Sequence, residues 1–169
     1  ASAAESGAEG IGLYRTEFQY MKRGTFPSEY ELFDSYRDVV EVMFPKPVTI
    51  RTLDINGDKA LSYAGDAREV NPVLGLRAIR YCLQNRDVFM AQLRAILRAA
   101  AYGNVRILFP MISNCGELSQ AKAMLAEAAD SLEKDGKAYN RDIEVGVMIE
   151  VPSAVVMADQ LARMCDFFS

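Results

Sequence analysis

Short apolar runs alternate with longer amphipathic stretches along most of the chain. The apolar runs are rich in valine, isoleucine, leucine and phenylalanine, and they lie at residues 10–14, 48–55, 105–110, 144–150 and 166–169. Runs of this length predict strands, and nearly continuous hydrophobicity is typical of parallel strands that are buried on both faces. We therefore expect roughly five to six strands in a parallel sheet.

The amphipathic stretches predict helices between these strands. Apolar residues recur at helical spacing, which indicates helices over residues 28–43, 86–101, 116–134 and from 152 onward. Ser28 and Glu31 form the sequence pattern of a capping box, and Pro45 ends that helix. Residues 56–75 carry turn signals and are expected to form a loop.

The alternation of strands and helices indicates an α/β fold built from βαβ units. An open doubly wound sheet and a (β/α)8 barrel of the TIM type both fit this pattern. A complete barrel typically takes about 250 residues, whereas this chain has 169. We therefore interpret residues 1–169 as one partial (β/α)8 barrel that is truncated at both ends. Exposed strand edges in such a fragment favour association.

Charge and composition exclude several classes of function. Lysine and arginine number 19, aspartate and glutamate number 23, and the formal net charge is −4. A mildly acidic chain is a poor candidate for binding nucleic acid. Histidine is absent, which excludes a Ser-His-Asp triad, a histidine-bound metal and a phosphohistidine within these residues. No stretch approaches the roughly 20 apolar residues of a membrane span.

The cysteines and the first residues bear on the cellular compartment. Cys82, Cys115 and Cys165 are odd in number and widely spaced, so we expect neither a disulfide framework nor a zinc site, and a reducing compartment. We expect all three as buried packing residues. The first residues lack a signal peptide and an initiator methionine. The chain is therefore expected to be a cytoplasmic piece of something longer.

Three charged residues stand within the predicted strands or at their ends. Arg15 follows the first apolar run, Arg51 lies inside the second, and Glu150 ends the fourth. The carboxyl ends of parallel strands carry the active site in such folds. The arginines favour an anionic ligand, and the carboxylate is a reasonable Mg²⁺ ligand. The plainer alternatives are that Arg51 pairs with Asp54 or another acid, and that Glu150 caps the next helix.

Other charged residues have weaker signals. Arg77 and Arg80 would share a face if they lay on a helix. Arg94 and Arg98 share a helix face that we expect to meet solvent. The Gly-Asp-Lys sequence at 57–59 lacks the spacing of a P-loop and is typical of a solvated turn.

Six stretches, taken together and in order, resemble one family. They are GIGLYRTEF at 10–18, RTLDINGDK at 51–59, NPVLGLRAIR at 71–80, QLRAILRA at 92–99, FPMI at 109–112 and VMIEVPSA at 147–154. The chain resembles enzyme I of the bacterial phosphoenolpyruvate-dependent sugar phosphotransferase system. The resemblance implies that enzyme's C-terminal phosphoenolpyruvate-binding (β/α)8 barrel, of which this chain would span roughly strands 2 to 7.

The resemblance also implies roles for particular residues. Those that would bind phosphoenolpyruvate are Arg15, Arg51, Arg77, Lys59 and Asn71. Glu150 matches one of the two acidic Mg²⁺ ligands. One departure is that Asn56 stands where the family usually has glycine before Gly57. Asparagine tolerates a left-handed backbone better than most residues, so the loop is expected to form.

The implied reaction passes the phosphoryl group of phosphoenolpyruvate to a histidine and then to a small phosphocarrier protein for sugar uptake. In the family that histidine lies on a separate N-terminal domain, and the second Mg²⁺ ligand and an acid/base cysteine lie beyond residue 169. We therefore expect no catalytic residue in this chain and no activity from it alone. The family also implies a homodimer.

Two alternatives remain open at this stage. One is the barrel of a related enzyme, pyruvate phosphate dikinase or phosphoenolpyruvate synthase. The other is a non-catalytic fragment that acts only by dimerising.

Overall fold

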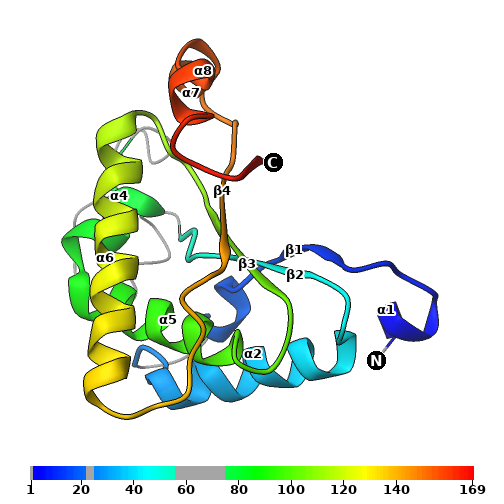
Figure 1. Cartoon of the computed structure of the whole chain (residues 1–169). Coiled ribbons are helices and arrows are strands. Elements are labelled where there is room, and N and C mark those ends of the chain that lie inside the picture. The colour runs from blue at the N-terminus through cyan, green and yellow to red at the C-terminus, as the bar shows by residue number, and fades with distance from the viewer. Residues whose placement is uncertain (1, 22–24, 56–74) are drawn as a thin grey trace.

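A parallel sheet forms the centre of the chain. The computed structural model describes residues 2–21, 25–55 and 75–169 (Figure 1). Within these ranges the strands are β1 (Ile11–Tyr14), β2 (Val48–Arg51), β3 (Val105–Phe109), β4 (Glu144–Val147) and β5 (Phe167–Phe168). Every neighbouring pair is parallel. Each of the predicted apolar runs therefore contributes a strand.

The order of the strands distinguishes the two folds that the pattern allowed. The strands stand in the sheet in chain order, β1-β2-β3-β4-β5. A doubly wound sheet reverses direction at a switch point, whereas a (β/α) barrel adds each strand beside the last. The strand direction turns steadily from β1 to β4, so the sheet is curled like half of a barrel (Figure 1). This arrangement fits a partial barrel of the TIM type.

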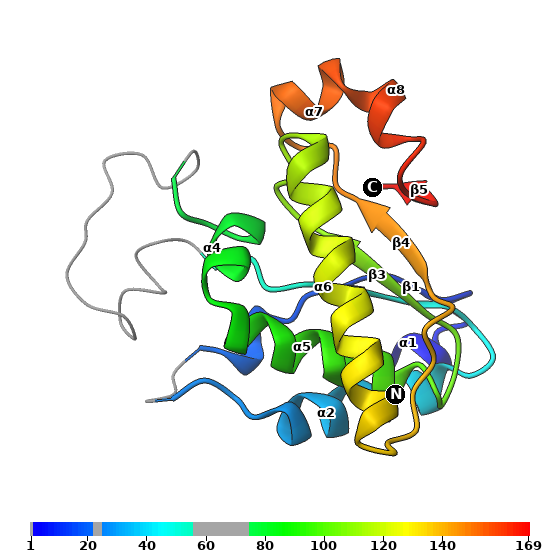
Figure 2. The same cartoon turned by 60° about the vertical axis from the view of Figure 1, so that its left-hand side comes forward.

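Helices cover one face of the curled sheet (Figure 2). The long ones are α2 (Glu29–Met43), α5 (Arg86–Ala99) and α6 (Cys115–Lys134), and α4 (Ile79–Gln84) precedes α5. A short helix, α1 (Ser2–Glu5), opens the described chain, and a 3-10 turn spans Glu17–Gln19. Beyond β4 lie α7 (Pro152–Val156) and α8 (Ala158–Leu161). The single helix predicted from residue 152 is thus two short helices that meet at Met157.

Local signals set the helix boundaries. Ser28 accepts a hydrogen bond from the Glu31 N–H while the Glu31 side chain accepts from the Ser28 N–H, which confirms the capping box. Asn114 caps α6 in a similar way. Arg77 precedes α4, whose N-cap is Ala78. Arg77 and Arg80 therefore do not share a helix face.

The apolar faces of the three long helices form the core with the strands. In α6 all six residues predicted to face inward are buried: Leu118, Ala121, Met124, Leu125, Ala128 and Leu132. The same holds in α5 for Phe89, Leu93, Ile96, Leu97 and Ala100. The periodicity of the sequence therefore gives the packing of these helices correctly.

The expectation that Arg94 and Arg98 face solvent is wrong. Both lie at a junction of three helices, where their side chains are only 11% and 15% exposed. Arg94 Nε and Arg98 Nη1 donate to the two carboxylate oxygens of Glu29 at 2.6 and 2.7 Å. Arg94 also donates to Asp135 at 2.7 Å. Glu29 lies on a neighbouring helix and is far away in sequence. Its carboxylate pairs with both arginines, so a helix face that was expected to be exposed forms a largely buried ion-pair cluster.

The three cysteines were predicted to be free of disulfide bonds and buried. All three cysteines are free, as expected, but only Cys82 is buried, and Cys115 and Cys165 are partly exposed. Packing alone thus explains Cys82 and not the other two.

Among the described ranges no helix combines the length and the hydrophobicity needed to cross a membrane.

The Glu29 cluster gives a test of stability. Burial disfavours the charged form of Glu29, but the hydrogen bonds from Arg94 and Arg98 outweigh burial and lower the carboxyl pKa from 4.5. Because the folded-state pKa is depressed, this stabilisation is complete above the ordinary pKa and is lost as the pH falls through the folded value. Glu29→Gln should lower the free energy of unfolding at pH 7 by about 1–3 kcal/mol.

Urea denaturation at pH 7 and at acid pH measures this effect. Glu29→Gln should also flatten the loss of stability with acid. Glu127→Gln is the matched control, because Glu127 pairs with Arg86 on an exposed surface where ion pairs contribute about 0–1 kcal/mol. Equal losses for the two variants would contradict the role of the cluster.

Candidate functional site

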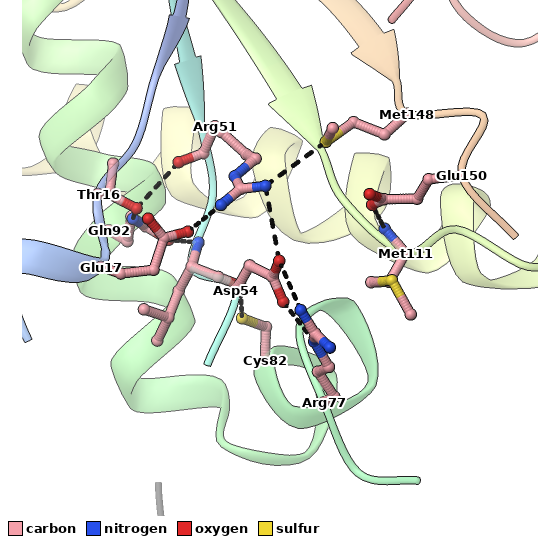
Figure 3. A network of polar contacts seen from close by, with 11 residues as sticks. Thr16, Glu17, Arg51, Asp54, Arg77, Cys82, Gln92, Met111, Met148 and Glu150 are labelled. Carbon is pink, nitrogen blue, oxygen red and sulfur yellow. Dashed lines mark hydrogen bonds and ion pairs between the residues drawn. The ribbon is translucent and has the colours of Figure 1, made fainter. Parts of the chain in front are cut away.

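The carboxyl ends of the strands carry a polar network (Figure 3). Since the strands are parallel, the segments that follow β1, β2, β3 and β4 meet at one edge of the sheet. Arg51 lies at the centre of this network, with dashed contacts to residues that follow β1, β2 and β4 (Figure 3). The ends of strands that are far apart in sequence therefore form one site.

Arg51 is largely buried and paired with acids. Its side chain is 10% exposed, and Nη2 donates to Glu17 in a short contact. Nη1 lies 3.5 Å from Asp54 Oδ2 and 3.9 Å from the sulfur of Met148. The plainer interpretation, that Arg51 pairs with Asp54 or another acid, is thus confirmed. A thioether is a weak acceptor, so the Nη1 donors remain weakly satisfied.

Asp54 holds a second arginine at the same place. Arg77 Nε donates to Asp54 Oδ1 at 2.7 Å and Nη2 donates to Oδ2 at 3.2 Å. The Asp54 side chain is only 6% exposed. This hydrogen-bonded pairing raises the pKa of Arg77, which keeps the guanidinium charged. The bidentate bond uses one edge of the guanidinium and leaves Nη1 of Arg77 outside it.

Arg15 stands on the loop after β1 and faces solvent. Within the described part of the chain it has neither a hydrogen bond nor an ion pair. The next two residues connect this loop to β2, because the Thr16 hydroxyl donates to the Arg51 carbonyl at 2.9 Å and Glu17 binds the Arg51 side chain. Arg15 is thus exposed, whereas its neighbours Thr16 and Glu17 are held in place by their bonds to Arg51.

Glu150 lies on the segment after β4. Its Oε1 accepts a hydrogen bond from the Met111 N–H at 2.8 Å. Met111 follows β3 and has a positive φ of 56°. The alternative that Glu150 caps the next helix is wrong, since α7 has Val151 at its N-cap and no side-chain cap. Instead Glu150 connects the ends of β3 and β4.

The described residues supply few metal ligands. No group of three or more acids, histidines or cysteines suited to a metal ion occurs among them. Glu150 is exposed, and only its Oε1 is engaged in a described hydrogen bond. Mg²⁺ commonly takes one or two carboxylates together with water and substrate phosphate oxygens. Glu150 alone fits such a partial set.

Two predicted residues cannot be placed. Lys59 and Asn71 lie outside the described residues, as do Asn56 and Gly57. Of the remaining four, the structure brings Arg51 and Arg77 together on Asp54, puts Arg15 on the neighbouring loop and puts Glu150 at the end of β4.

Several residues of the network were missed by the sequence analysis. Glu17, Thr16 and Gln92 had no assigned role, although Glu17 and Thr16 directly follow Arg15. Gln92 is 1% exposed and lies on the apolar face of α5, between Phe89 and Leu93. A lone amide within an apolar helix stripe is the signal that would have found it, because a buried amide must be hydrogen-bonded.

The arrangement is suited to an anion. Two guanidinium groups at one strand edge match the geometry of phosphate and carboxylate oxygens. The acids that hold them fix their orientation, because an arginine side chain otherwise has many rotamers. The site can therefore orient an anionic group before any chemistry begins.

Comparisons with known proteins identify the family of the chain. The family model described as "PEP-utilising enzyme, PEP-binding domain", where PEP is phosphoenolpyruvate, matches residues 1–169. The chain is 56% identical over 167 residues to a protein of Geobacillus stearothermophilus named phosphoenolpyruvate-protein phosphotransferase. It is 54% and 51% identical over 165 residues to proteins of the same name from Bacillus subtilis and Staphylococcus aureus.

These matches cover 98–99% of this chain but only 29% of each relative. The chain thus spans less than a third of the length of the curated relatives it matches. The family model, in contrast, matches this chain over all of residues 1–169. The chain belongs to the PEP-utilising enzyme family and lies within its PEP-binding domain.

Proposed function

We propose that the carboxyl edge of the sheet binds PEP through Arg15, Arg51 and Arg77, with Lys59 and Asn71 lining the same pocket. The observation that supports this best is the pair of arginines held by one buried carboxylate at the strand ends. Arg51 Nη1 has only Met148 and a long contact to Asp54 as partners. A phosphate oxygen is a much stronger acceptor than a thioether.

The charge balance favours a cation in the same site. Described arginines and acids at this edge are equal in number: Arg15, Arg51 and Arg77 against Glu17, Asp54 and Glu150. PEP adds a phosphate and a carboxylate, so the loaded site would be strongly negative. Mg²⁺ held by Glu150 offsets this charge, and its chemistry when bound is to neutralise and orient phosphoryl oxygens.

The proposed reaction is the transfer of the PEP phosphoryl group to a histidine. The relatives' name, phosphoenolpyruvate-protein phosphotransferase, supports this over the dikinase and synthase alternatives. The chain has no histidine, so the acceptor belongs to another part of the protein. Phosphoryl transfer depends mainly on positioning and charge neutralisation, which are what the arginines supply.

The remaining expectations belong to this proposal. They are a closed (β/α)8 barrel to which this chain contributes roughly strands 2 to 7, onward transfer to a small phosphocarrier protein for sugar uptake, a homodimer and a cytoplasmic location. The curled sheet with strands in chain order supports the barrel. A fragment that acts only by dimerising is less well supported, because it gives no reason for two arginines on one buried acid.

Calorimetric titration tests the proposal. The full-length protein that carries this segment should bind PEP in the presence of Mg²⁺, and removal of Mg²⁺ with EDTA should weaken binding by roughly tenfold or more, about 1.4 kcal/mol. The 169-residue chain alone should show no tight binding, because one carboxylate is an incomplete Mg²⁺ set. Failure of the full-length protein to bind PEP, or micromolar affinity in the short chain, would contradict this account.

Arg77→Lys tests the arginine pocket directly. Lysine is a point charge that cannot form the bidentate bond to Asp54 and also face a phosphate in a fixed direction. PEP affinity of the full-length protein should fall by roughly tenfold or more. Arg86→Lys is the control, since Arg86 forms an exposed pair with Glu127, and it should leave affinity unchanged. The same affinity in both variants would remove Arg77 from the site.

A further inference from the structure

The Gln92 side chain makes three hydrogen bonds in the core next to the arginine site. The residue is 1% exposed. Its carbonyl oxygen accepts from the Leu53 N–H at 2.9 Å, and its amide nitrogen donates to the Thr16 hydroxyl at 3.2 Å and to the Tyr36 hydroxyl at 3.1 Å. The Thr16 hydroxyl in turn donates to the Arg51 carbonyl at 2.9 Å. Figure 3 shows Gln92 beside Thr16, to the left of Arg51.

These bonds join the two loops that carry the arginines. Thr16 lies between Arg15 and Glu17 on the loop after β1. Leu53 lies between Arg51 and Asp54, where the chain has left β2. The β2 strand was predicted to run to residue 55 but ends at Arg51. The Leu53 N–H binds the Gln92 side chain and not a neighbouring strand.

We propose that Gln92 is a positioning residue for PEP, and that it sets the spacing between the Arg15 loop and the Arg51 loop without touching substrate. This inference rests on the proposed function of the site. Gln92 fixes one loop through Thr16 and the other through the Leu53 N–H, so its amide determines where Arg51 stands relative to Arg15.

The chemistry of an amide explains why glutamine fits this place. The position needs an acceptor for Leu53 and donors for Thr16 and Tyr36, and one primary amide supplies both. Helix α5 packs against α2 on one side and α6 on the other, so it offers a supported position from which Gln92 can hold both loops. Misplacement of a reacting group by about 1 Å can cost roughly 100-fold in rate.

Steady-state kinetics of the full-length protein with PEP and Mg²⁺ test the inference. Gln92→Met keeps the length and removes every hydrogen bond, and kcat/KM for PEP should fall roughly 10- to 100-fold. Thr16→Val is a milder variant that removes the Thr16 hydroxyl, which bonds to both Gln92 and the Arg51 carbonyl. Because both changes act through one path, the double variant should lose within about twofold of the worse single variant.

Two controls separate positioning from loss of stability. Leu132→Ala removes a buried side chain near the far end of α6, and Gln84→Met makes the same chemical change on an exposed residue. Both should leave kcat/KM within about twofold when assayed where the proteins are fully folded. Under those conditions, Gln92→Met or Thr16→Val kinetics equal to wild type would overturn the inference.

The wild-type measurement separates this inference from the proposed function. An inactive wild type that does not bind PEP overturns both. An active wild type whose kinetics are insensitive to Gln92→Met and Thr16→Val overturns only the role of Gln92.

Discussion

One carboxylate organises the carboxyl edge of this sheet. Asp54 is nearly buried and makes contact with both Arg51 and Arg77. An unpaired charge at that depth would be very costly, so the acid and the two arginines depend on one another. Such clusters give little net stability compared with apolar packing. The cluster instead fixes the orientation of the two arginine side chains. A guanidinium that is hydrogen-bonded along one edge presents its remaining donors at a fixed angle.

The fold explains why these residues meet. Parallel strands in chain order put each carboxyl end beside the next, so residues more than thirty positions apart share one edge. The long helices that cover the sheet pack through apolar faces, apart from the Glu29 cluster and Gln92 on α5. That single polar side chain connects the helix layer to the two arginine loops. The site therefore depends on the core as well as on the loops that form its surface.

Much of the fold could be predicted from the sequence. The strands, the three long helices, the capping box at Ser28 and the inward faces of α5 and α6 follow from local periodicity and turn chemistry. The end of β2 was placed too late, because the Leu53 N–H binds the Gln92 side chain and not a neighbouring strand. Arg94 and Arg98 were wrongly predicted to face solvent, because their partner Glu29 lies 65 and 69 positions away and cannot be recognised from local periodicity.

The site was only partly predictable. Arg51, Arg77 and Glu150 were identified through the resemblance, and their position at strand ends supported two of them independently. The pair of Arg51 with Asp54 was anticipated as an alternative. The pairs of Arg51 with Glu17 and of Arg77 with Asp54 were not, because they depend on how loops approach in three dimensions. Helix capping by Glu150 was a reasonable alternative that the structure excludes, because α7 has Val151 at its N-cap and Glu150 binds the Met111 N–H.

The most direct test is a crystal structure of the full-length protein with Mg²⁺ and PEP or a phosphonate analogue. The account predicts the phosphate within hydrogen-bond distance of Arg51 and Arg77, with the Arg77–Asp54 pair retained and Glu150 on the metal. An anion bound elsewhere, with both arginines paired to their acids as before, would contradict it.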